Sequence, residues 1–221
     1  MKEDKYKLGD IELLKNVILD DASILKESFY GRDTSIVAKE LLGKLLIKEL
    51  NGLVCGGIIL ETEAYYGHDD PASHAFRGIT PRSNIMFGRP GIAYIYLCYG
   101  MYCLLNVVTE KQGIPGAVLI RALQPVIGVE VMMKRRKIND DLNLTNGPGK
   151  LTVALGIDIK DNGKDLTKIH SGIGIFNTNI VFAETEIMVS SRVGITNGKD
   201  RLLRYYYKNN SLKQGKPFKH F

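Results

Sequence analysis

The residues best suited to acid–base chemistry are two glutamates separated by one threonine, Glu61 and Glu63. Because side chains alternate along a strand, the segment 59–65 divides into two faces. One face carries Ile59, Glu61, Glu63 and Tyr65, and the other, which we assign to the core, carries Leu60, Thr62 and Ala64. Repulsion and partial desolvation can tune one carboxylate of such a pair to act as a general base. A solvated strand edge with two ordinary surface glutamates fits the same pattern.

A long polar connection follows this segment and carries further reactive or charged side chains. His74 lies among glycine, proline and aspartate residues, and Arg82 and Arg89 add two cations farther along. Loops display functional side chains on a rigid scaffold, and connections this long are uncommon unless they bind something. The other interpretation is a solvated histidine in an ordered surface loop.

Tyrosine is concentrated in residues 93–102, at Tyr94, Tyr96, Tyr99 and Tyr102. Packing within strands explains most of these residues. Tyr99 differs, because it precedes Gly100 at an expected hairpin tip and would project into solvent unless it inserts into a partner, as wedges enter a base stack. Tyrosines on a neighbouring strand also offer flat rings on which a purine can stack.

Arg121 and Asn106 are polar residues in segments otherwise filled with Val, Leu and Ile. A buried arginine needs an acidic or polar partner, and Glu61 or Glu63 can provide it. A core ion pair without a chemical role fits equally well.

The segment Asn146-Gly-Pro-Gly-Lys150 can present backbone amides and a lysine to a phosphate at a helix start. It fits a plain helix start equally well. The glycine spacing excludes a P-loop.

Composition indicates a globular protein: the chain has 221 residues, of which 44% are hydrophobic and 24% are charged. We expect a single domain over residues 1–221, with residues 1–10 and 211–221 loosely ordered. No apolar run reaches the roughly 20 residues of a membrane span, and no signal-peptide core follows the first residues. We therefore expect a cytoplasmic protein with no membrane partner.

Charge and cysteine content limit the partners further. Thirty Lys and Arg against 24 Asp and Glu give a net charge of +6, which favours a polyanionic partner, although many basic proteins bind no nucleic acid. Cys55, Cys98 and Cys103 form no C-x-x-C pair, which argues against a disulfide framework and against a zinc site.

Short strands joined by tight turns dominate the pattern. A helix capped by Asp33 or Thr34 is expected to end at Gly43, and the pair 51–52, Asn-Gly, predicts a type I′ hairpin. A strand over 117–123 is expected to end before Pro125, where a helix reaching 138 begins. A second helix is expected to start at 146 or 147. The other strands are expected at 45–50, 54–66, 93–98, 102–109, 173–176, 186–190 and 203–207. This pattern indicates an antiparallel sheet in an α+β domain.

A set of short motifs is spread in a defined order over residues 25–210. They are Leu60-Glu-Thr-Glu-Ala-Tyr65, Ser73-His74, Thr80-Pro-Arg82, Tyr94-Ile-Tyr96, Tyr99-Gly-Met-Tyr102, Asn106, Arg121-Ala-Leu123, Gly147-Pro148, Lys150-Leu151 and Arg192-Val-Gly194. In this order they resemble the alkyladenine (3-methyladenine) DNA glycosylase family, in a bacterial form without a long N-terminal extension. Single motifs are weak, but the ordered set is highly specific.

The resemblance implies a fold and a catalytic centre. The fold is a single α+β domain with a curved antiparallel sheet, a protruding β-hairpin and surrounding helices, without a helix-hairpin-helix. The resemblance implies that Glu63 activates a water for attack on the sugar. It also implies that Arg121 and the main-chain carbonyl of Val193 help to hold this water.

The same resemblance implies how a base is held outside the duplex. Tyr65, His74 and Tyr96 match the residues that sandwich the flipped base, with His74 also forming a hydrogen bond. Asn106 matches a residue that rejects the amino group of normal guanine. Tyr99 matches the residue that enters the minor groove and fills the vacated space.

The expected reaction is monofunctional hydrolysis of the N-glycosidic bond of alkylated or deaminated purines in damaged double-stranded DNA, which starts base excision repair. Arg82, Arg136 in the basic run 134–137, and Lys150 are candidates for phosphate contacts. No lysine shares the face of the two glutamates to form a Schiff base, so water is the expected nucleophile, with no metal and no cofactor. We expect a monomer, associated with the nucleoid when bound to DNA.

Two other functions fit the residues. One is a hydrolase of free nucleosides or another glycoside, using Glu61 and Glu63 without DNA. The other is a module that only holds nucleic acid.

Gly88, Gly149 and the turn 109–113 depart from animal members of the family. These departures leave open the choice among 3-methyladenine, 7-methylguanine, hypoxanthine and ethenoadenine.

Overall fold

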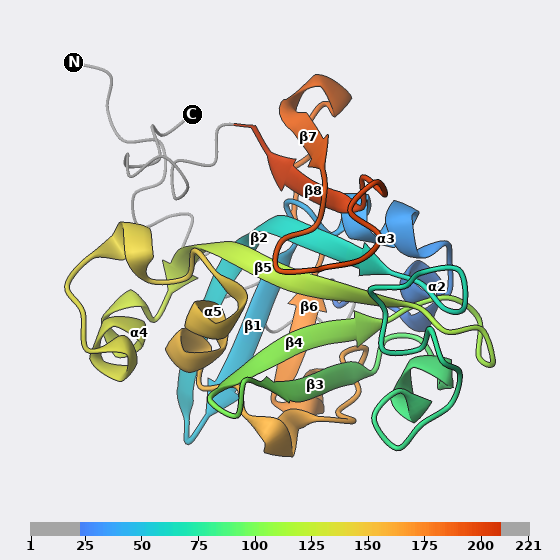
Figure 1. The fold of residues 1–221 in the computed structure, drawn as a ribbon. Helices are drawn as coiled ribbons and strands as arrows, with labels where there is room; N and C mark the ends of the chain where they lie inside the picture. The colour runs from blue at the N-terminus through green and yellow to red at the C-terminus, as the bar shows by residue number, and fades with distance from the viewer. Residues whose placement is uncertain (1–22, 209–221) are drawn as a thin grey trace.

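Eight antiparallel strands form one curved sheet in the computed structural model, which describes residues 23–208 (Figure 1). They are β1 (Leu45–Leu50), β2 (Leu53–Tyr65), β3 (Ala93–Cys98), β4 (Tyr102–Val108), β5 (Ala117–Ile127), β6 (Ile173–Phe176), β7 (Ile187–Ser190) and β8 (Arg204–Tyr207). The order across the sheet is β3-β4-β5-β2-β1-β6. β8 pairs with both β2 and β7, so β2 contacts three other strands.

Helices are short and lie around the sheet. The α-helices are α2 (Glu27–Tyr30), α3 (Thr34–Glu40), α4 (Val129–Arg136) and α5 (Pro148–Leu155). Short 3-10 helices occupy Asn84–Phe87, Asp141–Asn143, Ile159–Asp161, Ile169–Ser171 and Glu184–Glu186. The predicted α+β fold with a curved antiparallel sheet is confirmed, and no helix-hairpin-helix occurs in residues 23–208. The ends predicted to be loosely ordered, 1–10 and 211–221, lie outside the described residues.

Local sequence explains several of these elements. Asp33 caps α3, where its side chain accepts hydrogen bonds from the amides of Ser35 and Ile36. Asn51 and Gly52 join β1 to β2 with φ angles of 53° and 76°, the left-handed pair that a type I′ turn requires. Both features agree with the sequence-based prediction.

The region around Pro125 corrects the prediction. β5 continues through Pro125 to Ile127, and α4 begins only at Val129. Pro125 lies opposite Gly57, where the register with β2 shifts, and a proline that donates no amide hydrogen bond is tolerated at such a bulge. Gly128, with a φ of 68°, then turns the chain into α4.

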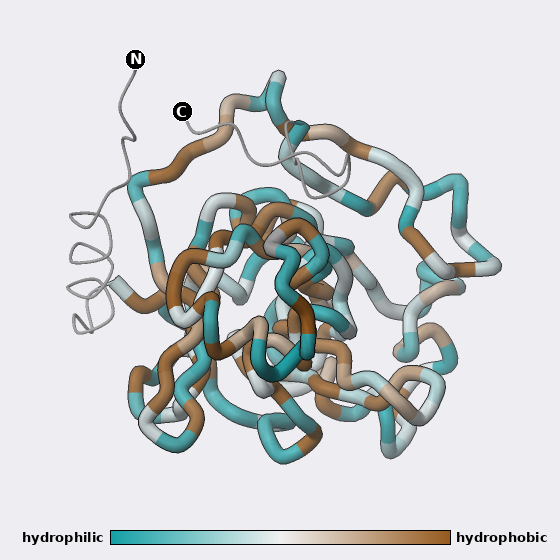
Figure 2. The backbone as a smooth tube through the Cα atoms, turned by 90° about the vertical axis from the view of Figure 1, so that its left-hand side faces the viewer, coloured by the Kyte–Doolittle hydropathy of each residue, from teal (hydrophilic) through white to brown (hydrophobic). Residues whose placement is uncertain are grey.

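The helices cover one face of the sheet and form the larger core with it. Residues of α3, α4 and α5 pack there against β2, β4 and β5; among them are Val37, Ala38, Met132, Leu151, Leu155, Ile59, Ala64, Leu105, Val118 and Ile120. In Figure 2 hydrophobic residues alternate with hydrophilic ones along the segments in the middle of the molecule. A smaller cluster on the other side includes Leu45, Ile58, Leu60 and Tyr207.

A bulge in β2 corrects the predicted assignment of faces. Ile59 lies opposite Leu123 and Glu61 lies opposite Ala122, so Leu60 is an extra residue in β2. Side-chain alternation restarts after it, and Ile59 therefore packs in the same core cluster as Ala64, not on the face of Glu61. Leu60 belongs to the smaller cluster.

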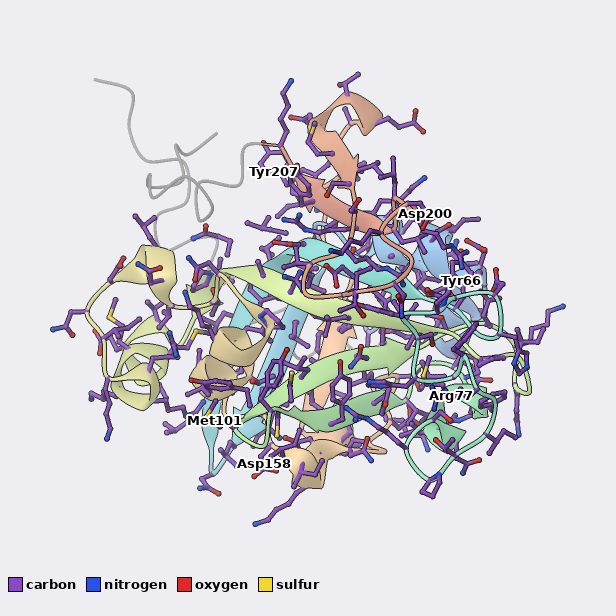
Figure 3. The ribbon with its side chains drawn as sticks, in the orientation of Figure 1. Tyr66, Arg77, Met101, Asp158, Asp200 and Tyr207 are labelled. Atoms are coloured by element: carbon purple, nitrogen blue, oxygen red, sulfur yellow. The ribbon has the colours of Figure 1, made fainter. Side chains whose placement is uncertain are left out.

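The β3–β4 hairpin protrudes as predicted. Its turn contains Tyr99 and Gly100, with φ angles of 50° and 69°, and the side chain of Tyr99 is 88% exposed. The hairpin packs closely against the start of α5. A Cβ atom added to Gly149 would lie only 2.9 Å from Cβ of Tyr102. Met101, labelled in Figure 3, lies at the free end of this hairpin.

Candidate active site

Glu63 is completely buried and contacts two hydrogen-bond donors and one cation. Its Oε1 accepts a 2.7 Å hydrogen bond from the amide of Val193 and lies 3.3 Å from Nε of Arg121. Its Oε2 accepts a 2.8 Å hydrogen bond from the hydroxyl of Tyr65. Val193 and Tyr65 donate hydrogen bonds to Glu63, and Arg121 contributes a cation, whose Nε donates its hydrogen bond to Glu61.

The protonation of these donors follows from their surroundings. Burial, followed by the charge of Glu63, raises the pKa of the Tyr65 hydroxyl, so this group keeps its proton and donates. Burial alone would lower the pKa of Arg121, but Glu63 and Glu61 raise it above its ordinary value. The guanidinium therefore stays charged beside the two glutamates.

Glu61 is buried as well, with 4% of its surface exposed. Its Oε1 lies 3.0 Å from Nε of Arg121 and 2.6 Å from Nε of Arg204. The interpretation of this segment as a solvated strand edge is therefore wrong, whereas the placement of Glu61, Glu63 and Tyr65 on one face is correct.

A second bulge explains how Arg121 reaches these carboxylates. Glu61 lies opposite Ala122 and Thr62 lies opposite Ile120, so Arg121 is an extra residue in β5. Bulges redirect side chains and are frequent beside active sites. The two bulges, one in each strand, place the charged residues of β2 and β5 on the same side of the sheet.

A cavity of about 360 Å³ opens beside this cluster. It falls within the size range of small-molecule sites. Its lining includes the predicted residues Tyr65, His74, Tyr96, Tyr99, Asn106, Arg121 and Val193. Glu63 lies behind this wall, in contact with three of the residues that form it. The sequence-predicted base pocket and catalytic group are thus adjacent.

His74 forms an aromatic wall of the cavity together with Tyr96. The two rings pack edge to face with centroids 4.6 Å apart. Nδ1 of His74 lies 2.7 Å from the hydroxyl of Tyr94, which leaves Nε2 for a ligand. Burial, and then the charge of Arg82, lowers the pKa of His74 to about 4. The imidazole is therefore neutral at physiological pH.

Asn106 is 3% exposed and borders the same cavity. Its Nδ2 donates a 3.1 Å hydrogen bond to the carbonyl oxygen of Tyr94. Since a carbonyl can only accept, this contact fixes which end of the amide is nitrogen. The side chain is held rigidly between β3 and β4.

The three cations predicted to contact phosphates are dispersed. The guanidinium of Arg82 lies 4.6 Å from the ring centroid of Tyr96, which lines the cavity. Lys150 and Arg136 both contact the loop before α5. Lys150 donates to Oδ1 of Asn146 at 2.7 Å, and Arg136 donates to the carbonyl of Asn143 at 3.3 Å. A role for these three in binding DNA stays a prediction.

Sequence reasoning missed a buried ion pair behind the cavity. The guanidinium of Arg192 lies 2.6 Å from both carboxylate oxygens of Asp70, and it stacks 4.6 Å from the ring centroid of Tyr65. It also donates to the carbonyl of Ala64. Burial raises the pKa of Asp70, but the hydrogen bonds from Arg192 outweigh this and hold the pKa below its ordinary value. This pair supports the Tyr65 ring from behind.

Arg204 was also missed. It sits in a short strand of aromatic residues, and a charged residue in such a strand is the same signal that identified Arg121. For Arg192 the signal was weaker, because two neighbouring aspartates, Asp69 and Asp70, were equally available partners in the sequence.

Two further observations concern other classes of site. Within residues 23–208 no group of three His, Cys, Asp or Glu side chains is arranged to hold a metal ion. No helix in the described part of the chain is both long enough and apolar enough to cross a membrane.

Comparison with known proteins identifies the family. Residues 28–211 match the family model described as Methylpurine-DNA glycosylase (MPG). A candidate 3-methyladenine DNA glycosylase of Carboxydothermus hydrogenoformans is 48% identical over 187 residues, which cover 85% of this chain and 96% of the relative. A protein with the same name from Prosthecochloris aestuarii is 45% identical, covering 82% of this chain and 86% of the relative. Another, from Clostridium acetobutylicum, is 44% identical, covering 84% and 95%.

The chain therefore belongs to the methylpurine-DNA glycosylase family, and the resemblance drawn from its motifs is confirmed. It is a DNA glycosylase, a hydrolase of N-glycosyl bonds that acts on DNA and belongs to base excision repair.

Replacing Arg121 tests whether its contacts serve both the fold and the reaction. Arg121→Ala is expected to lower the free energy of unfolding by about 3–5 kcal/mol, because two buried carboxylates lose a partner. It should also slow base release in the protein that remains folded. Thermal melting and base-release rates separate the two effects.

The matched control is Arg32→Ala, which removes a surface ion pair with Glu40 and should cost less than about 1 kcal/mol. An Arg121→Ala protein as stable and as active as the wild type would show that this residue has neither role.

Proposed function

We propose that the protein flips alkylated or deaminated purines out of duplex DNA and hydrolyses their bond to deoxyribose with a water activated by Glu63. The observation that carries this proposal is the position of Glu63, fully buried directly behind the cavity and bonded to Tyr65, Arg121 and Val193 of its wall. A general base must lie within hydrogen-bond reach of the proton that it accepts, so the proposal requires that a water at this wall reach a carboxylate oxygen of Glu63 when a substrate is bound.

The cavity supports capture of a flipped purine. Tyr65, His74 and Tyr96 offer aromatic faces and edges on which a base can stack. The neutral imidazole of His74 adds a hydrogen-bonding edge without repelling the positive charge of an N-alkylated base. Asn106, fixed by the carbonyl of Tyr94, is the proposed residue that excludes the amino group of normal guanine.

The proposed reaction is a single displacement by water. The water oxygen bonds to C1′, the bond from C1′ to the base nitrogen breaks with its electron pair going to the base, and the proton of the water passes to Glu63. A cationic N-alkylated base leaves as a neutral molecule, and an uncharged base such as hypoxanthine takes up a proton from solvent as it leaves. Negative charge on the carboxylate also stabilises the oxocarbenium-like sugar as the base leaves. Glu63 contacts Val193, Tyr65 and Arg121, none of which can form a Schiff base, and this supports a monofunctional reaction.

The proposed DNA contacts come from the hairpin tip, from Arg82 beside Tyr96 and from the region at the start of α5. Tyr99 borders the cavity and projects from the hairpin tip, where it could fill the space that the flipped base leaves. Arg82 lies beside Tyr96, and Arg136 and Lys150 lie near the start of α5, where cations can contact the phosphate backbone. We further propose that the protein acts as a monomer in the cytoplasm, on damaged duplex DNA at the nucleoid.

Glu63→Gln is expected to retain binding to lesion-containing duplex DNA but to slow base release by about 100-fold or more, because an amide cannot accept the proton of the water. Single-turnover release of 3-methyladenine, 7-methylguanine, hypoxanthine and ethenoadenine measures the effect and ranks these substrates. Glu49→Gln, at an exposed glutamate of β1, is the control. Wild-type rates in the Glu63→Gln protein, or equal activity on free nucleosides, would refute the proposal.

Tyr99→Ala is expected to reduce flipping and slow excision while the free energy of unfolding changes by less than about 0.5 kcal/mol, as for an exposed residue. Fluorescence of 2-aminopurine beside the lesion reports flipping, and a melting curve reports stability. Leu53→Ala, next to the β1–β2 turn, is an exposed apolar control. A stability loss of about 3–5 kcal/mol would instead identify Tyr99 as a packed core residue.

A further inference from the structure

We infer that Arg204 is a positioning residue for the reaction: it neutralises Glu61, so that Arg121 remains the partner of Glu63. The inference rests on the proposed function, because it takes Glu63 as the general base. Its evidence is a separate set of contacts between β8 and β2.

Arg204 is built into the sheet beside both glutamates. In the pairing of β2 with β8, Arg204 lies opposite Glu63, yet its Nε points to Oε1 of Glu61 at 2.6 Å. One guanidinium nitrogen donates to Ser190 at 3.3 Å, and the guanidinium carbon lies 4.9 Å from the ring centroid of Tyr206. Only 17% of its side chain is exposed. These contacts hold Arg204 in one orientation.

The distances show why Arg121 alone would not suffice. Its Nε lies 3.0 Å from Glu61 and 3.3 Å from Glu63, so one donor is shared between two buried carboxylates. Two buried carboxylates with one cation carry a net negative charge, and such a pair takes up a proton at higher pH than a balanced one. Arg204 supplies the second cation.

The other groups around Glu63 do not replace Arg204. On β2 and β3, Tyr65 and Tyr96 face it with neutral hydroxyls whose pKa values are raised mainly by burial. From the loop before β8, Arg192 acts on it electrostatically, but both oxygens of Asp70 already bind that guanidinium. The cluster thus holds three carboxylates and three guanidiniums among the described residues, namely Glu61, Glu63 and Asp70 with Arg121, Arg192 and Arg204.

The test is the pH dependence of base release by Arg204→Met. We expect the acid limb of the single-turnover rate to move to higher pH by about one unit, since removal of a nearby cation makes a carboxylate easier to protonate. The rate on the alkaline plateau should stay within about two-fold of the wild type. The substrate is a duplex containing 7-methylguanine, because this base already carries a positive charge and needs no acid to leave.

Two matched variants make the test specific. Glu61→Gln combined with Arg204→Met restores the balance of charge and should return the acid limb to its wild-type position, as a double-mutant cycle would reveal. Arg201→Met removes a neighbouring arginine that pairs with Asp69 instead, and it should leave the limb in place. Melting curves establish that each variant is folded.

Glu61→Gln alone provides a reading that does not depend on the stability of the Arg204→Met protein. It should move the acid limb to lower pH, because Arg121 then pairs with Glu63 alone and makes that carboxylate harder to protonate.

An unmoved acid limb in folded Arg204→Met, with a rate lowered equally at every pH, would overturn the inference and point to a contact with DNA. Failure of the double variant to restore the limb would overturn it too. Full activity of Glu63→Gln in the same assay would instead refute the proposed function itself.

Discussion

The structure depends on one constraint: two carboxylates on the same face of a central strand are buried, and buried charge is tolerated only when it is paired. Glu61 pairs with Arg121 of β5 and Arg204 of β8, and Glu63 pairs with the same Arg121. Glu63 also accepts a hydrogen bond from the amide of Val193 in the loop before β8. Elements far apart in the sequence must therefore meet at β2. The same convergence builds the wall of the cavity, so the contacts that stabilise the charges also place them beside the cavity.

Irregularity in the sheet makes this convergence possible. In a regular β2, Ile59 would lie on the same face as the glutamates. In a regular β5, Arg121 would follow the strict alternation of side chains between the two faces. One extra residue in each strand separates the packed part of the sheet from the charged part. The Arg192–Asp70 pair then supports Tyr65 from behind, so that the aromatic wall and the carboxylate share one rigid frame. In the proposed reaction, a site held in this way would require little reorganisation.

Much of this arrangement could be predicted from the sequence because it depends on local rules. The Asn51-Gly52 turn, the Asp33 cap and the shared face of Glu61 and Glu63 follow from turn chemistry, capping and strand alternation. The course of β5 through Pro125 could not be predicted, because it depends on a register shift in the partner strand. The partners of Arg192 and Arg204 likewise depend on long-range pairing, which one sequence does not reveal.

In the proposed mechanism, Glu63 directs a water onto the sugar of a base held in the cavity. The most direct measurement is a crystal structure of the Glu63→Gln protein bound to a duplex containing ethenoadenine. We expect the base to lie between Tyr65, His74 and Tyr96, with a water within hydrogen-bond distance of the residue 63 side chain and facing C1′. A base still stacked in the duplex, or a sugar whose C1′ faces away from residue 63, would contradict it.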